Sequence, residues 1–201
     1  MNTSLALRRR RLVTVIGAVV LAAVIAGSAV LIGQQSLAAA STPLLSGPVT
    51  EADGLIREEG AVSVFDDVPA VSNLDAELLA AVRTAATAAA ERDGVTMHVN
   101  SGWRSAAYQQ QLREDAVAQY GSEHEAARWV ATPENSEHVS GDAVDLGPVA
   151  AQDWLSRHGA EFGLCQIYAN ERWHFELRPG AVANGCPLMY ADPNADPRVH
   201  R

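Results

Sequence analysis

The chain has 201 residues, 48% of them apolar, and a formal net charge of -9 at pH 7. This length and apolar content can fill one core of ordinary size but not two, so we expect a single folded domain. The 15 basic residues are all Arg, and four of them stand together at positions 8–11. The rest of the chain is therefore strongly acidic, which excludes the clustered basic surface on which nucleic-acid binding depends.

A long apolar run, residues 12–33, follows this Arg cluster. A helix needs about 20 such residues to cross the hydrocarbon core of a membrane, and a basic flank stays in the cytoplasm. The pattern predicts a cytoplasmic segment over 1–11 and a single-pass anchor over 12–33, with the rest of the chain outside the cell. The small residues up to Ala40 are also typical of a signal-peptidase site, so a secreted protein cleaved near Ala40 is the alternative.

The segment 34–60 is rich in Ser, Pro, Gly and other small residues and has no sustained hydrophobic period. We interpret it as a flexible tether between the membrane and a domain that covers residues 61–190. The final stretch, 191–201, is dominated by Asp and Pro. It predicts a disordered tail.

The first regular element of the domain is expected after the tether. Apolar residues recur at helical spacing over 74–92, and Gly94 follows as a helix terminator. Residues 95–99 then alternate between apolar and polar side chains, which is typical of a half-buried strand. This strand leads directly into the segment 101–105, Ser-Gly-Trp-Arg-Ser.

The same criteria predict the elements that follow. They are helices over 105–120, 123–130 and 151–158, and short strands over 143–146, 166–169 and 173–177. Helices and short strands are mixed without a regular strand-helix alternation. The fold class expected from this pattern is α+β.

Two cysteines, Cys165 and Cys186, lie in the part of the chain that we expect outside the cell, where disulfides form. We predict that they pair. The closed loop of about 22 residues would stabilise the fold by roughly 3 kcal/mol in the chain-entropy model. Free buried thiols and thiolate zinc ligands are the alternatives, and the absence of a close Cys-x-x-Cys spacing weighs against zinc.

Histidine and carboxylate side chains gather in two separate segments. In the first, His138 precedes Gly141, which permits a tight turn, and Asp145 follows on the next predicted strand. A turn followed by a strand can bring a His and an Asp seven residues apart onto one metal ion. In the second, alternation along the strand places His174 and Glu176 on the same face.

Two imidazoles and one carboxylate, from His138, His174 and Asp145, form a ligand set that suits zinc. Three protein ligands leave a fourth coordination position free for water. Such an open position is typical of a catalytic zinc site rather than a structural one.

Three motifs together resemble the zinc D-alanyl-D-alanine carboxypeptidase family, the VanY-like enzymes and their D,D-dipeptidase relatives. Ser-x-His-x-x-Gly-x-Ala-x-Asp fits residues 136–145 at every fixed position, Glu-x-x-His fits 171–174, and Ser-Gly-aromatic-Arg-Ser fits 101–105. The resemblance covers about residues 74–178. It implies a small, mainly antiparallel sheet packed with helices, with a zinc site in a cleft, as in the hedgehog-like D-Ala-D-Ala carboxypeptidase fold.

For the metal site, the resemblance implies zinc ligands at His138, Asp145 and His174 and a general base at Glu171. A carboxylate near the metal can take a proton from the attacking water and return it to the leaving amine. Glu176 is the rival base, because it shares a strand face with His174. Glu171 is preferred because it matches the family spacing and stands where the strand begins.

For the substrate, the resemblance implies that Arg104 contacts the peptide and stabilises the developing oxyanion, a role that suits its permanent charge. The alternative is an ordinary Arg at a helix start, where its charge opposes the helix dipole. Ser136 corresponds to a family Ser that holds the terminal carboxylate of the substrate, and the alternative is a turn-capping hydroxyl. Gln109 is expected on the next helix, facing the cleft.

The function that follows is removal of the terminal D-Ala from peptidoglycan stem peptides by a Zn²⁺ enzyme outside the membrane. An endopeptidase that cuts wall crosslinks would use the same site, and a non-catalytic wall-binding module is a further alternative. Serine D,D-peptidase chemistry is excluded, because its Ser-x-x-Lys motif needs a Lys and this chain has none. The expected partners are the stem peptide and the membrane, with no nucleic acid and no obligate protein partner.

Overall fold

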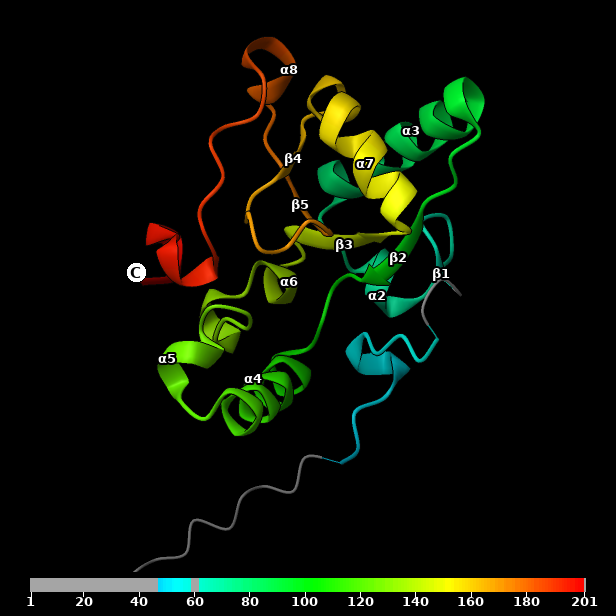
Figure 1. Ribbon diagram of the computed structural model, residues 1–201. Helices are drawn as coiled ribbons and strands as arrows, with labels where there is room; N and C mark the ends of the chain where they lie inside the picture. The colour runs from blue at the N-terminus through cyan, green and yellow to red at the C-terminus, as the bar shows by residue number, and fades with distance from the viewer. Residues whose placement is uncertain (1–46, 59–61, 201) are drawn as a thin grey trace, which may run out of the picture. The chain divides into compact units, whose positions relative to one another are not determined.

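A five-stranded antiparallel sheet in the order β1-β2-β3-β5-β4 organises the computed structural model, which describes residues 47–58 and 62–200 (Figure 1). Every pair of neighbouring strands is antiparallel. The strands are β1 (Val62–Ser63), β2 (His98–Ser101), β3 (Ala143–Gly147), β4 (Leu164–Gln166) and β5 (His174–Leu177). The sheet with its helices confirms the α+β class that the sequence predicts.

Two helices, α3 (Ala76–Asp93) and α7 (Val149–His158), pack on one side of the sheet and contact each other (Figure 1). Helix α3 begins where the Asp75 carboxylate accepts hydrogen bonds from two backbone N–H groups of the first turn. The main hydrophobic core lies between these helices and the sheet. It includes Leu78, Val82 and Ala85 of α3, Val99, Val144 and Phe175 of the strands, and Trp154 of α7.

The remaining helices are short, apart from α4 (Ala106–Tyr120). They are α2 (Pro69–Ser72), α5 (Glu123–Ala126), α6 (Glu137–Ser140) and α8 (Ala181–Asn184), with single 3-10 turns at Glu51–Asp53, Pro133–Asn135, Gly159–Phe162, Pro193–Ala195 and Pro197–His200. In Figure 1, α6 and the α4–α5 pair lie on the side of the sheet opposite to α3 and α7. The polar site described below lies on the side of the sheet that faces α4 and α6.

The predicted elements are present, with shifted ends. The strand expected over 95–99 is β2, which begins only at His98, because Val95 still donates its N–H to Ala89 O at the end of α3. The helix expected over 123–130 ends at Ala126, and the residues after it form turns. The strand expected over 166–169 begins and ends earlier, as β4.

The prediction of a tether over 34–60 is wrong for the part that the structure describes. Residues 51–53 form a 3-10 turn, and Asp53 accepts hydrogen bonds from both the backbone N–H and the hydroxyl of Ser105, each at 2.9 Å. Gly54 is buried against the backbone of Trp103. Side-chain and backbone polar pairs, together with packing of Ile56 against the core, therefore fix this segment on the domain.

The prediction of a disordered tail over 191–201 is also wrong for its described residues. Asp196 is fully buried, and Arg198 makes ion pairs with Glu137 and Glu176. Ion pairs of Arg198 hold residues 191–200 in place, so the segment is ordered although its sequence has no regular spacing of apolar residues. Cys165 and Cys186 form a disulfide, which confirms the predicted pairing.

Within residues 47–58 and 62–200, no helix is long and apolar enough to span a bilayer. The cytoplasmic segment predicted over 1–11, the anchor predicted over 12–33 and the potential cleavage site near Ala40 lie outside the described residues.

Candidate metal centre

The loop after β2 positions Arg104 at the site. Gly102 is required here, because a Cβ at this position would lie 1.9 Å from Ala70 O. The backbone N–H of Trp103 donates to the same carbonyl oxygen at 2.9 Å, and the N–H of Arg104 donates to His138 O at 3.1 Å. The motif over 101–105 is thereby held against α2 and α6, and it places the Arg104 side chain beside the predicted ligands.

His138 and Asp145 are brought together by a turn at Gly141. Gly141 has a φ of 88°, and an added Cβ would lie 2.7 Å from Asn73 O, so both the conformation and the space require glycine. The turn reverses the chain from α6 into β3. As the sequence predicts, this short connection carries a His and an Asp to one place.

His174 reaches the same place through sheet pairing. In the antiparallel pair β3–β5, Asp145 stands directly opposite His174. Val144 and Leu146, its neighbours on β3, face the hydrophobic core, so the alternation of the strand directs Asp145 to the other face. The two strands therefore present a carboxylate and an imidazole side by side.

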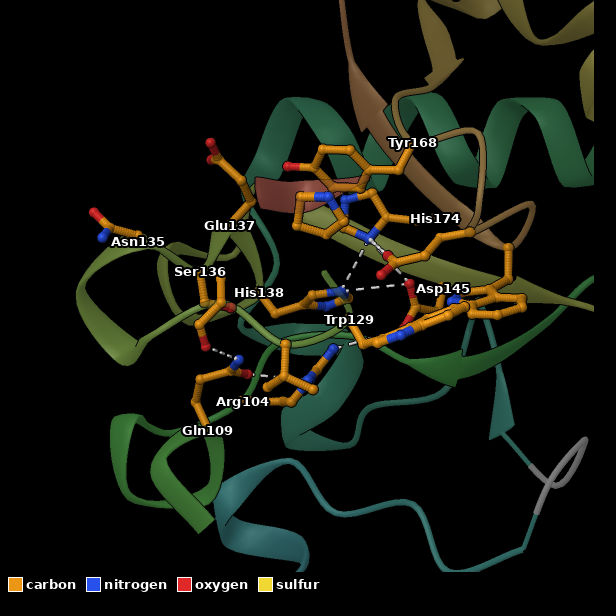
Figure 2. A pocket seen from close by; sticks show the side chains of 15 residues that line it. Arg104, Gln109, Trp129, Asn135, Ser136, Glu137, His138, Asp145, Tyr168 and His174 are labelled. Atoms are coloured by element: carbon orange, nitrogen blue, oxygen red, sulfur yellow. Dashed lines mark hydrogen bonds and ion pairs between the residues drawn. The ribbon is translucent and has the colours of Figure 1, made fainter. Parts of the chain in front are cut away.

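The three side chains form a compact, buried donor group (Figure 2). His138 Nε2 lies 3.2 Å from His174 Nδ1 and 3.4 Å from Asp145 Oδ1, and His174 Nδ1 lies 3.2 Å from the same oxygen. All three donor atoms fall within 4.8 Å of one another. Separations of this size fit three ligands of one ion whose metal-to-ligand bonds are about 2.0–2.2 Å long.

Both imidazoles are fixed through their second ring nitrogen. His138 Nδ1 lies 2.9 Å from Gly102 O, and His174 Nε2 lies 3.3 Å from Glu176 Oε1. A carbonyl and a carboxylate can only accept hydrogen bonds, so each pins a proton on the nitrogen that faces it. Once any proton on the other nitrogen is lost, each ring can present the nitrogen that faces Asp145 with a free lone pair, the form that a metal ligand needs.

Charges of both signs surround the donor group and act differently on its three members. Burial and the Arg104 charge lower the pKa of His138. Burial opposes ionisation of Asp145, but His138 and His174 hold its pKa below the usual range. Burial likewise opposes protonation of His174, yet the carboxylates of Asp145 and Glu176 raise its pKa to about 10. The carboxylates therefore favour positive charge at His174, whereas burial and Arg104 oppose it at His138.

Glu171 and Glu176, the two candidate bases, lie on opposite sides of the His174 ring. Glu171 Oε2 is 3.7 Å from Nδ1, on the side of the donor group, and Glu171 lines the cavity there. Glu176 is fully buried, faces Nε2, and is paired with Arg178 and Arg198. Of the two, only Glu171 has access to a ligand bound at the donor group.

Arg104 and Gln109 border the same cavity. Arg104 Nη2 is 3.6 Å from Asp145 Oδ2, and its Nη1 donates to Gln109 Oε1 at 3.0 Å. Gln109 is 2% exposed, and its Nε2 donates to Ala131 O at 2.8 Å. Gln109 therefore contacts the guanidinium, while Arg104 Nε is buried without a partner among the described residues.

Ser136 lines the cavity as well. It precedes α6 at the N-cap position, but its hydroxyl makes no capping hydrogen bond. This geometry speaks against the alternative of a turn-capping serine.

Three further residues of the site and its surroundings were not anticipated from the sequence. The Tyr168 ring centroid lies 5.0 Å from that of His174, and Tyr168 lines the cavity together with Trp129, as Figure 2 shows. Arg198 contacts both Glu137 and Glu176 from a segment with no apolar pattern. In the sequence, the placement of Glu176 on the same strand face as His174 is the feature that could have indicated a cation nearby.

The chain is similar in sequence to proteins of known activity. A family model described as VanY, D-alanyl-D-alanine carboxypeptidase, matches residues 72–179, a little over half of the chain. A D-alanyl-D-alanine carboxypeptidase of Enterococcus faecalis (strain ATCC 700802 / V583) is 32% identical over 112 residues, which cover 43% of this chain and 42% of the relative. The chain thus spans less than half of the length of this curated relative.

Two solved structures illustrate the likeness. A vancomycin resistance D,D-pentapeptidase VanY from a VanB-type cassette, in complex with Zn(II), is 28% identical with a TM-score of 0.48 and covers 52% of this chain and 72% of its own. The LdcB LD-carboxypeptidase is 21% identical with a TM-score of 0.51 and covers 67% of this chain and 72% of its own. The second likeness concerns the fold.

Proposed function

This chain belongs to the VanY family of D-alanyl-D-alanine carboxypeptidases, and on that premise we propose that it is a zinc-dependent D,D-carboxypeptidase. Its reaction is hydrolysis of the terminal D-Ala-D-Ala bond of peptidoglycan stem peptides outside the cell membrane. The observation that carries the proposal is the convergence of His138, Asp145 and His174 within 4.8 Å at a cavity that Arg104 and Glu171 also line.

The donor set fits zinc by its chemistry. His138 Nε2, Asp145 Oδ1 and His174 Nδ1 are the atoms that would hold the ion, and the cavity beside them leaves room for a water molecule and a substrate carbonyl. Bound zinc supplies a Lewis acid, which lowers the pKa of water toward about 7 and polarises a carbonyl.

Glu171 is the proposed general base. Its carboxylate stands on the cavity side of His174, and burial raises its pKa to about 7. A carboxylate in this position accepts a proton from the attacking water and delivers it to the amine of the leaving D-Ala. Glu176 has no route to the cavity, because Arg178 and Arg198 enclose it on the far side of the ring.

Arg104 is the proposed cation for the substrate. Its guanidinium lies at the edge of the donor group and keeps its charge although burial lowers its pKa. It can stabilise the oxyanion that forms on the scissile carbonyl, while Gln109 fixes its orientation through the 3.0 Å hydrogen bond. We assign Gln109 this positioning role rather than a direct contact with substrate, and Ser136 remains the proposed donor to the terminal carboxylate.

The location of the domain outside the membrane is part of the proposal. It rests on the family substrate and on the Arg-flanked apolar run over 12–33. The disulfide between Cys165 and Cys186 agrees with an oxidising compartment.

The test is an assay of the full-length chain with two substrates. Metal content is measured first, and D-Ala release is then followed from a stem pentapeptide and from a crosslinked dimer, with Glu171→Ala as the control. We expect one zinc per chain, D-Ala release from the pentapeptide, and a Glu171→Ala variant that keeps zinc and loses release. A zinc-loaded protein that cuts only the crosslinked dimer would replace the carboxypeptidase by an endopeptidase, and a protein without zinc affinity would refute both.

A further inference from the structure

The C-terminal segment, residues 192–200, lies outside the part of the chain that matches the family model and nevertheless reaches the back of the donor group. Between the disulfide and this segment, Tyr190 pairs with Tyr168, and the segment itself contains two 3-10 turns, Pro193–Ala195 and Pro197–His200. Pro193 lines the cavity of the site.

Arg198 forms two hydrogen bonds with the carboxylate of Glu176, which faces His174. Its Nη1 donates to Glu176 Oε2 at 2.8 Å and its Nη2 donates to Glu176 Oε1 at 3.1 Å. This two-point contact fixes the plane of the carboxylate, because a guanidinium presents its donors in a rigid fork. Oε1 is also the atom that lies 3.3 Å from His174 Nε2.

The same guanidinium touches the neighbour of the second histidine. Arg198 Nη1 is 2.9 Å from Glu137 Oε1, and Glu137 directly precedes His138 in α6. Arg198 therefore contacts a carboxylate adjacent to each of the two candidate histidine ligands.

Asp196 holds Arg198 in place. It is fully buried, and it accepts hydrogen bonds from Arg198 Nε and from the Tyr168 hydroxyl, the latter at 3.1 Å. The Tyr168 ring in turn packs against the ring of His174. Three acidic groups and two arginines, Arg178 and Arg198, thus form one network behind the site, in which Glu176 and Asp196 are buried and the other members are partly exposed.

We propose that Arg198 is a positioning residue of the metal centre. By holding Glu176 in plane, it keeps the Nε2–H of His174 directed at Oε1 and so presents Nδ1 to the ion. The inference rests on the proposed zinc site. Groups that orient a metal-bound histidine typically change metal affinity by about 10- to 100-fold when removed.

The experiment compares variants of the full-length chain for zinc affinity, measured by competition with a chromogenic chelator. Arg198→Gln is expected to weaken zinc binding by about 10- to 100-fold. Arg198→Lys keeps a charge near Glu176 but loses the fork, so it is expected to recover part of the affinity. The matched control is Arg128→Gln, because Arg128 Nε binds Asp192 Oδ2 at 3.0 Å and ties down the same segment without touching Glu176.

A double variant separates positioning from general stabilisation. If Arg198 acts through Glu176, then Glu176→Gln with Arg198→Gln binds zinc no more weakly than Glu176→Gln alone. At saturating zinc, Arg198→Gln should show kcat largely restored and KM little changed, because Glu171, Arg104 and Ser136 are untouched.

The outcomes are distinguishable. A wild-type chain that binds zinc, together with Arg198 variants of unchanged zinc affinity, overturns the inference even if their melting temperatures fall. Equal losses of affinity in Arg198→Gln and Arg128→Gln also overturn it, since docking of the segment alone would then explain the effect. A wild-type chain that binds no zinc refutes the proposed function instead.

Discussion

The two sides of the His174 ring are built from the same residue types and have opposite properties. On the Nδ1 side, Asp145 and Glu171 lie within 3.7 Å, and both line the cavity. On the Nε2 side, Glu176 is fully buried in a network with two arginines. One imidazole thus separates an open, reactive face from a closed, neutralised one.

The difference shows in the two glutamates. Burial raises the pKa of Glu171 to about 7, and the charges of His174 and Arg104, which act in the opposite direction, do not outweigh it. Burial acts on Glu176 in the same direction, but hydrogen bonds from His174 and Arg198 outweigh it and lower the pKa of Glu176 to about 2. A carboxyl of the first kind can exchange a proton near neutral pH, whereas one of the second kind is a fixed negative charge. We therefore expect substitutions on the Nδ1 side to lower turnover and substitution of Glu176 on the Nε2 side to lower zinc affinity.

The largest effect on turnover is expected on the open side. Glu171→Gln retains the size of the side chain but cannot take a proton from water. We expect a loss in kcat of about 10²- to 10⁴-fold with zinc content unchanged, measured by D-Ala release and metal analysis. Full turnover in this variant would remove Glu171 from the role of base.

Arg104→Lys is the next test of the open side. Lys keeps the charge but lacks the planar fork with which Arg104 binds Gln109 through one nitrogen and can face a developing oxyanion with another. We expect kcat to fall by about 10²- to 10³-fold, the usual cost of losing one oxyanion donor, while zinc stays bound. Gln109→Leu serves as the companion variant, because it frees the guanidinium without removing it and should cost less. An unchanged kcat in Arg104→Lys would show that only the charge matters.

The sequence predicted the open side well and the closed side poorly. His138, Asp145 and Glu171 stand in motifs with fixed local spacing, and the Gly141 turn that joins the first two is itself visible in the sequence. The direct pairing of Asp145 with His174 needs the register of β3 and β5, which local patterns do not determine.

The closed side depends on contacts between residues far apart in the chain. Arg198 lies 22 positions from Glu176, in a segment whose Asp and Pro content is typical of disorder. Asp53, in the segment interpreted as a tether, is fixed by Ser105, 52 positions away. Hydrophobic periodicity detects elements that bury an apolar face, so segments that dock through ion pairs and hydrogen bonds escape it.

Removal of the disulfide tests whether the strand pair beside Glu176 contributes to stability rather than to turnover. Cys165 stands opposite Glu176 in the pair β4–β5, and its bond to Cys186 closes a separation of 21 residues. Replacing both cysteines by Ser should lower the free energy of unfolding by roughly 3 kcal/mol, seen in denaturant titration. At temperatures where the variant is folded, kcat should be nearly unchanged. A large loss of kcat in the folded variant would connect this strand pair to the chemistry.

The smallest effect, and the one that best separates the two faces, is expected for Glu176→Gln. The amide oxygen can still accept the Nε2–H of His174, but the negative charge that supports the imidazole is gone. We expect zinc affinity to fall by about 10- to 100-fold, measured by chelator competition, with kcat largely restored when zinc is saturating. Glu171→Gln should show the reverse, intact affinity and lost turnover. If Glu176→Gln instead abolished turnover with zinc bound, Glu176 rather than Glu171 would be the base, and the closed face would have to open during the reaction.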